Sequence, residues 1–418
     1  MLKAMDHEWR DIPWDQAVLA ARPPVANALE KALAGDDLDF DEGLLLATVD
    51  GDDLLALVRV ADEIRRRVVG DQVTYVVNRN LNFTNVCIVG CAFCAFSRGP
   101  NAPDAYFHST ESLVAKAVEA VALGATEVCI QGGLPGDLDG RYYADLLRAI
   151  KSRLPDIHVH AYSPMEIRYG VEKTGLPLRE YLLMLKEAGL GSIPGTAAEI
   201  LDDEVRESLS PNKLTAPQWV EVIRAAHGLD IPTTSTMMYG HTERPEHWVR
   251  HMLLLREIQK DTRRFTEFVP LGFIHYETRL FKGGHARAGR TLREDLVVHA
   301  LARVLLNGYI PNIQVSWVKL GLEGSLSCLD AGANDFGGTL MEESISKAAG
   351  APFGEYVAPG EFRALIRTIG RTPAERSTTY KIRTVYAHPD ADERLPTAPL
   401  PMLADAPGHA PVMSATGY

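Results

Sequence analysis

The sequence predicts an α/β fold, a (βα)8 barrel preceded by a helical extension and followed by a mobile tail. Two observations predict the barrel. From Val73 onward, short β-branched runs alternate with longer amphipathic stretches, which is typical of repeated βα units around a parallel sheet. The alternation gives about eight units in roughly 270 residues, the size of a TIM-type barrel, whose chemistry lies on loops after the strand C-termini.

Residues 1–70 are predicted to form the helical extension, because apolar residues recur there at helical spacing. Its helices are expected over 14–33, 41–46 and 52–69. The barrel is expected over 71–386, with helices over 111–123, 142–153, 178–188, 246–260 and 293–306. Its strands are predicted to begin near Val73, Glu127, His158, Ser192, Thr233, Thr266, Ile313 and Ala333.

The segment 387–418 is rich in Pro, Ala, Asp and Gly and carries few apolar side chains. Such a segment buries too little apolar surface to offset the entropy lost on ordering it. We therefore expect a mobile tail after the barrel.

Composition excludes several classes of protein. The net charge of −12, with no stripe of Lys and Arg, argues against a nucleic-acid partner. No apolar run approaches the ~20 residues that span a bilayer, so no membrane partner is expected. The charged N-terminus, Met1 to Arg10, does not resemble a secretory signal. Three of the five cysteines are closely spaced, which indicates metal ligation in a reducing compartment, and we expect a cytoplasmic protein.

The closely spaced cysteines follow the first predicted strand as Cys87-x3-Cys91-x2-Cys94. Three thiolates can bind three irons of a [4Fe-4S] cluster and leave the fourth iron open. The open iron can chelate the amino and carboxylate groups of S-adenosylmethionine (SAM). An electron from the reduced cluster then breaks the sulfonium and yields a 5'-deoxyadenosyl radical. The pattern therefore predicts a radical SAM enzyme.

A zinc site is the alternative interpretation of the triad, since zinc also binds closely spaced cysteines and a distant His could complete it. Structural zinc sites commonly pair two Cys-x2-Cys knuckles. Here one compact triad has an aromatic residue, Phe93, directly before its third cysteine. Cys129 and Cys328 stand in apolar surroundings and are predicted to be inert core residues.

Two further loops are predicted to bind the cofactor. Gln131-Gly132-Gly133 follows the second strand, and paired glycines let the backbone approach a ligand closely, although a plain tight turn would also explain them. After the fourth strand, the small-residue loop with Thr196 and Glu199 offers a carboxylate suited to a ribose or an amino group. A helix start with Glu near its N-terminus is the alternative there.

Three strand ends supply candidate catalytic residues. His160 and Glu166 follow the third strand, where such groups can hydrogen-bond or exchange protons, although one histidine of this strand can also be a barrel-filling residue. His241 and His275 come directly after the fifth and sixth strands and are predicted to bind substrate.

These motifs together resemble the tyrosine-using subunit of the synthase that makes 7,8-didemethyl-8-hydroxy-5-deazariboflavin (FO), the chromophore of coenzyme F-420. The resemblance runs from about Val73 to Tyr380 and is specific in several separate places. Besides the cysteine triad, these are the segments 75–80, 126–129, 160–166, 193–200, 237–241, 316–321 and 332–343. The sequence departs from the family's pattern at Ala92 and Gly272, and Tyr276 lies in a stretch that varies among relatives.

The resemblance implies a transferase that joins the 4-hydroxybenzyl fragment of L-tyrosine to 5-amino-6-(D-ribitylamino)uracil. It would release 2-iminoacetate, 5'-deoxyadenosine and methionine. It also implies a reducing electron donor such as flavodoxin or ferredoxin. Because only one cysteine triad is present, a separate radical SAM partner enzyme is expected to close the deazaflavin ring. The alternative function is that of a radical SAM enzyme of the futalosine pathway to menaquinone.

Overall fold

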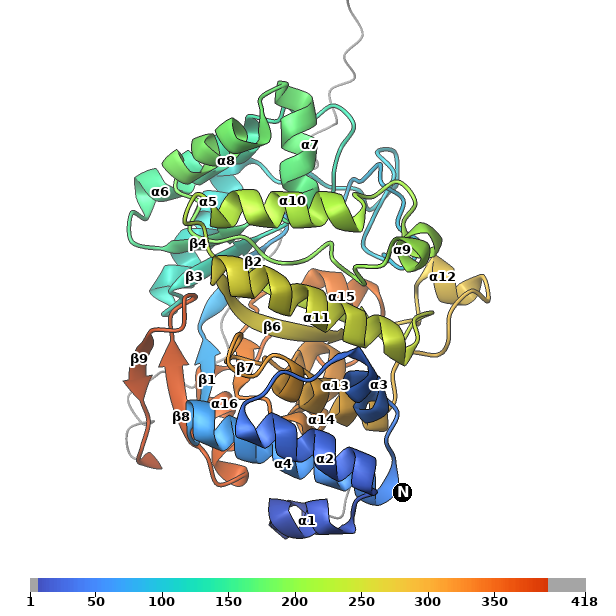
Figure 1. The fold of residues 1–418 in the computed structure, drawn as a ribbon. Coiled ribbons are helices and arrows are strands. Elements are labelled where there is room, and N and C mark those ends of the chain that lie inside the picture. The colour runs from blue at the N-terminus through green and yellow to red at the C-terminus, as the bar shows by residue number, and fades with distance from the viewer. Residues whose placement is uncertain (1–6, 390–418) are drawn as a thin grey trace, which may run out of the picture.

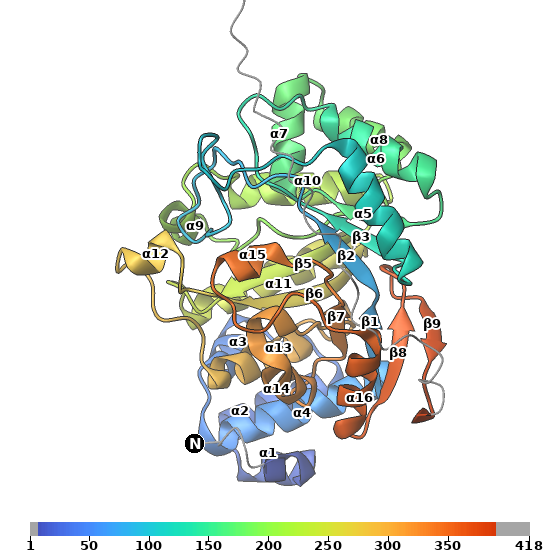
Figure 2. The ribbon, with the colours of Figure 1, turned by 180° about the vertical axis from the view of Figure 1, so that it is seen from behind.

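The computed structural model describes residues 7–389 of the 418-residue chain. Helices surround a set of mostly parallel strands, so the α/β class is confirmed (Figure 1). The N-terminal helices lie at one end of the molecule and α5 to α8 at the opposite end, as both views show (Figures 1 and 2). No helix within the described residues is long and apolar enough to cross a membrane.

Four α-helices precede the first strand: α1 (Trp14–Ala20), α2 (Pro23–Ala34), α3 (Phe40–Ala47) and α4 (Gly51–Val69). The expected single helix over 14–33 is wrong, because the chain is extended at Arg22 (ψ 144°). Pro23 explains the break, since a proline lacks the N–H of a helical hydrogen bond and disfavours helical backbone in the residue before it. Buried side chains of these helices share one core with those of α11 and α13.

The strands are β1 (Gln72–Val76), β2 (Asn78–Leu81), β3 (Glu127–Ile130), β4 (His158–Ala161), β5 (Thr233–Tyr239), β6 (Phe265–Gly272), β7 (Asp335–Gly338), β8 (Thr372–Arg376) and β9 (Ile382–Val385). They form three sheets, ordered β7-β1-β8-β9, β2-β3-β4 and β5-β6. All pairings are parallel except that of β9 with β8.

The described strands do not form one closed sheet. Single bridges join the sheet edges instead: His160 to Ser192, Ile193 to Thr233, Phe268 to Ile313, and Gln314 to Asp335. The strands predicted near Ser192 and Ile313 are therefore reduced to isolated bridges. Near Ser192 the cause is Pro194, which has no N–H to donate to a ladder. The segment at Ile313 is cut short because α14 begins at Trp317.

The helices after β2 are α5 (Thr110–Ala122), α6 (Tyr142–Arg153), α7 (Pro164–Thr174), α8 (Leu178–Glu187), α9 (Asp203–Leu209), α10 (Ala216–His227), α11 (Pro245–Thr262), α12 (Arg279–Lys282), α13 (Leu292–Leu305), α14 (Trp317–Leu329), α15 (Ser344–Ala348) and α16 (Pro359–Thr368). All five helices predicted for the barrel are confirmed, within a few residues at each end. The predicted ranges did not include the short helices α9, α12 and α15 or the longer helices α7, α10, α14 and α16.

Strands β8 and β9 were also missed. Strand β8 pairs with β1 in parallel register from Gln72–Thr372 to Tyr75–Glu375. Its sequence, Thr-Pro-Ala-Glu-Arg, carries a proline and two charges, which are depleted in strands. The predicted tail overlaps the described residues only at 387–389, and its remainder, 390–418, lies outside them.

Candidate active site

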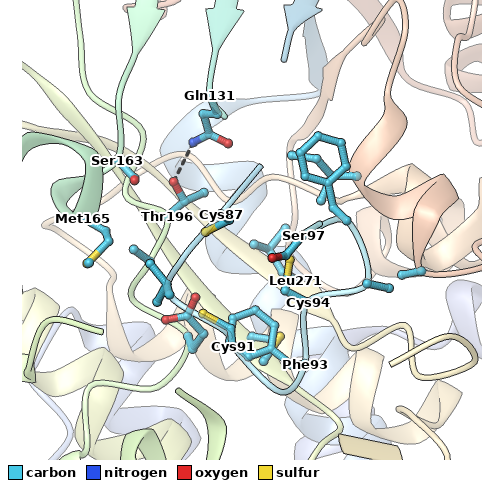
Figure 3. A pocket seen from close by; sticks show the side chains of 18 of the residues that line it. Cys87, Cys91, Phe93, Cys94, Ser97, Gln131, Ser163, Met165, Thr196 and Leu271 are labelled. Carbon is cyan, nitrogen blue, oxygen red and sulfur yellow. Dashed lines mark hydrogen bonds between the residues drawn. The ribbon is translucent and has the colours of Figure 1, made fainter. Parts of the chain in front are cut away.

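The three cysteines of the triad lie on one loop that leaves β2 and line one side of a single cavity (Figure 3). Neighbouring loops hold this loop through its backbone. The Ile88 N–H donates to the Leu134 carbonyl at 2.9 Å, and the Ala92 N–H donates to the Leu209 carbonyl at 2.8 Å. The Arg279 guanidinium donates to the Gly90 carbonyl at 2.9 Å. The loop is therefore fixed from three sides without using its thiols.

The donor set suits an iron–sulfur cluster. Within residues 7–389, no three His, Cys, Asp or Glu side chains converge on a point that could hold one metal ion. A cubane instead takes each thiolate on a different iron, which matches three cysteines spread along a loop. Burial raises the pKa of Cys91 to about 11, and the nearby Lys213 ammonium opposes that rise. A bound iron would stabilise this thiolate, because a coordinating thiol is deprotonated by its metal.

The cavity beside the cysteines, here called the outer cavity, has a volume of about 280 Å³. It brings together every residue that the sequence predicted for the cofactor: Phe93, Gln131, Gly132, Gly133, Thr196 and Glu199. Gln131 donates to the Thr196 hydroxyl at 2.6 Å, so the loop after β3 is joined directly to the loop after the bridged segment at 192–193 (Figure 3).

The two glycines are required by packing within the protein. A Cβ on Gly132 would overlap the ring of Phe83, and a Cβ on Gly133 would overlap the carbonyl of Val86. The Gly133 N–H also donates to the Thr84 carbonyl at 2.8 Å. The glycine pair therefore lets the loop after β3 lie directly against the chain that leads into Cys87.

Glu166 lines the outer cavity and caps α7. Its carboxylate accepts from the Ser163 N–H at 2.6 Å, the Ser163 hydroxyl at 2.7 Å and the Gly132 N–H at 3.1 Å. Burial raises the pKa of Glu166 to about 7, although these hydrogen bonds favour the ionised form. The structure thus uses this side chain to fasten α7 to the glycine pair.

Lys213 is a cavity residue that the sequence did not reveal. Its ammonium lies 2.7 Å from the Glu199 carboxylate and 5.3 Å from the centre of the Phe93 ring. Glu199 also lies 3.4 Å from the Arg206 guanidinium. Lys213 stands in the connection between α9 and α10, away from any strand end, so no βα pattern marked it.

A second cavity of about 270 Å³, here called the inner cavity, is lined by His160 and by other polar strand residues. It shares lining residues with the outer cavity: Gln131, Thr196, Thr236, Leu271, Lys319 and Ile345. Its lining alternates along the strands, as in Asn78 and Asn80, or Glu127 and Cys129. Cys129 thus faces this cavity, so the prediction that it is a core residue is wrong, whereas Cys328 is fully buried in the core as predicted.

His160 is neutral in this setting. Its Nδ1 is hydrogen-bonded to the Ser192 hydroxyl at 2.6 Å, and burial lowers its pKa to about 4. His158, on the same strand face, shares that hydroxyl at 2.7 Å. The two histidines and Ser192 therefore form one hydrogen-bonded group where β4 meets the bridged segment at 192–193.

Within residues 7–389, neither cavity is lined by the other two predicted histidines, His241 and His275. His241 is fully buried, with Nε2 donating to the Met238 carbonyl at 3.0 Å and Nδ1 lying 3.1 Å from Glu243. His275 packs on Tyr276 and Phe281, with ring centroids 4.1 and 4.4 Å away. The structure thus brings His160 and Glu166 to the cavities but holds His241 and His275 apart from them.

Comparison with known proteins decides the family. Residues 81–255 match the family described as the radical SAM superfamily, and residues 262–389 match the CofH/MqnC C-terminal region. A 5-amino-6-(D-ribitylamino)uracil–L-tyrosine 4-hydroxyphenyl transferase of Methanocaldococcus jannaschii is 51% identical over 336 residues, which cover 80% of this chain and 94% of that protein. The chain belongs to this radical SAM transferase family. The sequence-based resemblance is confirmed.

A second transferase of that name, from Methanopyrus kandleri, is 51% identical over 363 residues, or 87% of this chain and 98% of its own. An FO synthase of Mycobacterium leprae is 53% identical over 343 residues, 82% of this chain but 40% of that protein. The chain therefore spans less than half the length of the FO synthases that it matches.

Solved structures support the fold alone. The hydrogenase maturase HydG of Carboxydothermus hydrogenoformans superposes with a TM-score of 0.68 at 14% identity, covering 88% of this chain and 83% of its own. Methylornithine synthase (PylB) gives 0.64 at 16% identity, covering 83% and 97%. Both place the chain in the TIM-type radical SAM fold.

Proposed function

We propose that this chain transfers the 4-hydroxybenzyl fragment of L-tyrosine to 5-amino-6-(D-ribitylamino)uracil during FO synthesis. The observation that carries the proposal is the continuity of two cavities with different linings. The outer cavity has the cysteine triad, and the inner cavity, which shares six of its lining residues, has the polar strand residues. Two substrates and a cofactor can thereby meet inside one set of strands, as a bond-forming transfer requires.

The cofactor assignment follows from the outer cavity. Cys87, Cys91 and Cys94 would hold a [4Fe-4S] cluster, and the residues predicted for the cofactor would bind SAM: Phe93, Gln131, Gly132, Gly133, Thr196 and Glu199. When bound, the reduced cluster supplies the electron that cleaves SAM to methionine and a 5'-deoxyadenosyl radical. The chain's own contribution is to orient SAM and to surround it with side chains that exclude water.

The inner cavity would hold the uracil and its ribityl chain. Uracil carbonyls, ring N–H groups and hydroxyls need neutral hydrogen-bonding partners, and the Asn, Gln, Thr and neutral His side chains of this cavity offer both donors and acceptors. The carboxamide oxygen of Asn80 is buried and has no hydrogen-bond partner among the described residues, so it is free to accept from a ligand.

The single bridges support an eight-membered barrel as the working unit, over about residues 71–386. Strands β1 and β2 are separated by one residue, Val77, and β1 pairs with β7 while β2 pairs with β3. If the bridged segments at 192–193 and 313–314 are counted as strands, β4 is connected to β5 and β6 to β7, and the order of neighbouring strands leads back to β1. We propose that these segments act as one (βα)8 ring around the inner cavity, with residues before 71 as a separate helical extension.

The proposal includes two protein partners. A low-potential donor such as flavodoxin or ferredoxin would reduce the cluster. A separate radical SAM enzyme would close the deazaflavin ring, as the family resemblance implies for a sequence with one cysteine triad. Thiolate ligands require a reducing compartment, and we place the reaction in the cytoplasm.

The test is to supply reduced enzyme with SAM, tyrosine and the uracil and to follow small molecules by mass spectrometry. Deoxyadenosine is expected together with a 4-hydroxybenzyl adduct of the uracil, and the adduct should require both substrates. Isotope in the tyrosine ring should pass to the adduct, whereas isotope in the carboxylate should leave with 2-iminoacetate. A product that retains the adenosyl group, or turnover indifferent to tyrosine, would contradict the proposal and favour the futalosine-type alternative.

A further inference from the structure

Three cationic side chains line the two cavities in the described part of the chain: Lys213, Arg376 and Lys319. The first two have carboxylate partners. Lys213 lies 2.7 Å from Glu199, and Arg376 forms a two-pronged pair with Asp335 at 2.5 and 2.8 Å. Their charges are therefore matched within the protein.

Lys319 differs from both. It is the third residue of α14, and its ammonium donates to the Ser346 hydroxyl of α15 at 2.8 Å. Within residues 7–389 no carboxylate lies within the 4.0 Å of an ion pair with it. The negative charge of Glu343 partly opposes the effect of burial on the pKa of Lys319, but the two Glu343 carboxylate oxygens accept from the Ser346 N–H at 2.9 and 3.1 Å.

A cation in this position calls for an anionic ligand. Burial lowers the pKa of Lys319, because the ammonium has given up water without gaining a paired carboxylate. An arriving carboxylate would supply the missing charge and a charge-assisted hydrogen bond. The backbone of Lys319 is fixed, because the Arg290 guanidinium donates to the Lys319 carbonyl at 2.6 Å.

We propose that Lys319 binds the carboxylate of the amino-acid substrate where the outer and inner cavities meet, an inference that rests on the proposed function. The ribitylaminouracil has no carboxylate to offer. SAM has one, but its proposed anchor is the open iron beside the cysteines. Lys319 lines the inner cavity as well as the outer one, and no cysteine of the triad lines the inner cavity. Tyrosine is therefore the ligand that fits.

The test compares reconstituted holoenzymes carrying Lys319→Met, which keeps the length of the side chain without its charge, and Lys319→Arg, which keeps the charge. The Met variant should raise the KM for tyrosine by about 10- to 100-fold, the loss expected for a hydrogen bond between charged groups. The KM values for SAM and the uracil should hold within about 3-fold, and the Arg variant should recover part of the tyrosine affinity. Lys347→Met on α15 is the matched control, because this lysine is 65% exposed.

Tyramine, which is tyrosine without its carboxylate, supplies a second measurement. Wild-type enzyme should bind tyramine, as an inhibitor, about 10- to 100-fold more weakly than tyrosine, and Lys319→Met should bind the two about equally. An unchanged tyrosine KM in that variant, or a rise confined to SAM or the uracil, overturns the inference. If the variant fails to fold, equal binding of tyramine and tyrosine by the wild type overturns it.

The two proposals fail in different ways. Wild-type enzyme that forms no adduct contradicts the proposed function. Wild-type enzyme that forms the adduct while Lys319→Met retains its tyrosine KM contradicts only the role of Lys319.

Discussion

At the scale of single residues, the structure brings the six residues predicted for the cofactor to one cavity but keeps two of the four predicted catalytic residues, His241 and His275, out of both cavities. The triad and the glycine pair are short motifs, and residues that are adjacent in sequence remain adjacent in the folded structure. His241 and His275 were chosen by their place after strands, yet packing buries one against Glu243 and stacks the other on Tyr276. Lys213 and Lys319 could not be predicted as site residues, because only the folded structure shows that they line the cavities and which carboxylates lie near them.

The first prediction concerns the triad. Cys87→Ala, Cys91→Ala and Cys94→Ala should each abolish deoxyadenosine formation, because a lost thiolate exposes or releases an iron. Deoxyadenosine by chromatography and the broad absorption near about 400 nm would report the loss. Cys328→Ala is the control and should retain both signals, since that thiol is fully buried in the core. Cleavage of SAM at the parental rate without Cys91 would refute the cluster assignment.

The second prediction concerns the glycine pair. Gly133→Ala should reduce iron content and lower stability by about 1–3 kcal/mol, because the added methyl would overlap the Val86 carbonyl and push the cysteine loop away. Gly136→Ala is a matched control on the same loop, since its methyl would meet Ile88 at an ordinary 3.5 Å. Thermal denaturation and iron analysis would measure both. Equal stability and iron content in the two variants would show that the loop moves to accommodate the added methyl group.

At the scale of elements, amphipathic helices were predictable and short strands were not. Helix α6, for example, buries one face with Tyr143, Leu147 and Ile150, and this apolar spacing is visible in the sequence. The segments at 192–193 and 313–314 pair through single bridges, which is too little for any periodic signal. Strand β8 was missed because its pairing partner, β1, lies at the other end of the barrel sequence. Pairing with β1 stabilises β8 as a strand, although its residues have a low strand propensity.

The third prediction tests β8 by truncation. A chain ending after His388 should keep its cluster and turnover, because the removed residues are poor in apolar side chains. A chain ending after Arg371 loses β8 and the Arg376 guanidinium. The buried Asp335 carboxylate then has no cationic partner, a loss of about 3–5 kcal/mol in comparable buried pairs. Soluble yield and circular dichroism would separate the two, and a stable, active short chain would show that β8 is dispensable.

At the scale of the whole molecule, alternating βα units predicted a (βα)8 barrel and the cysteine triad predicted a radical SAM enzyme, whereas the incomplete closure of the sheet was not visible in either pattern. The outer and inner cavities are lined by strands and loops that are far apart in sequence. The triad comes from residues 87–94, whereas Lys319 and Ser346 come from the last third of the chain. The chemistry of the site thus depends on long-range assembly.

That assembly has a consequence for biosynthesis. The hydroxyl of Thr74 in β1 donates to the carboxylate of Asp335, 261 positions later, and β8 follows later still. A ribosome adds about 5–20 residues each second, so β1 waits roughly 15–60 seconds for both neighbours, with its hydrogen-bonding edges unpaired. Contacts this distant in sequence also slow folding itself. The edges of β1 are therefore exposed to pairing with other chains until β7 and β8 have been synthesised.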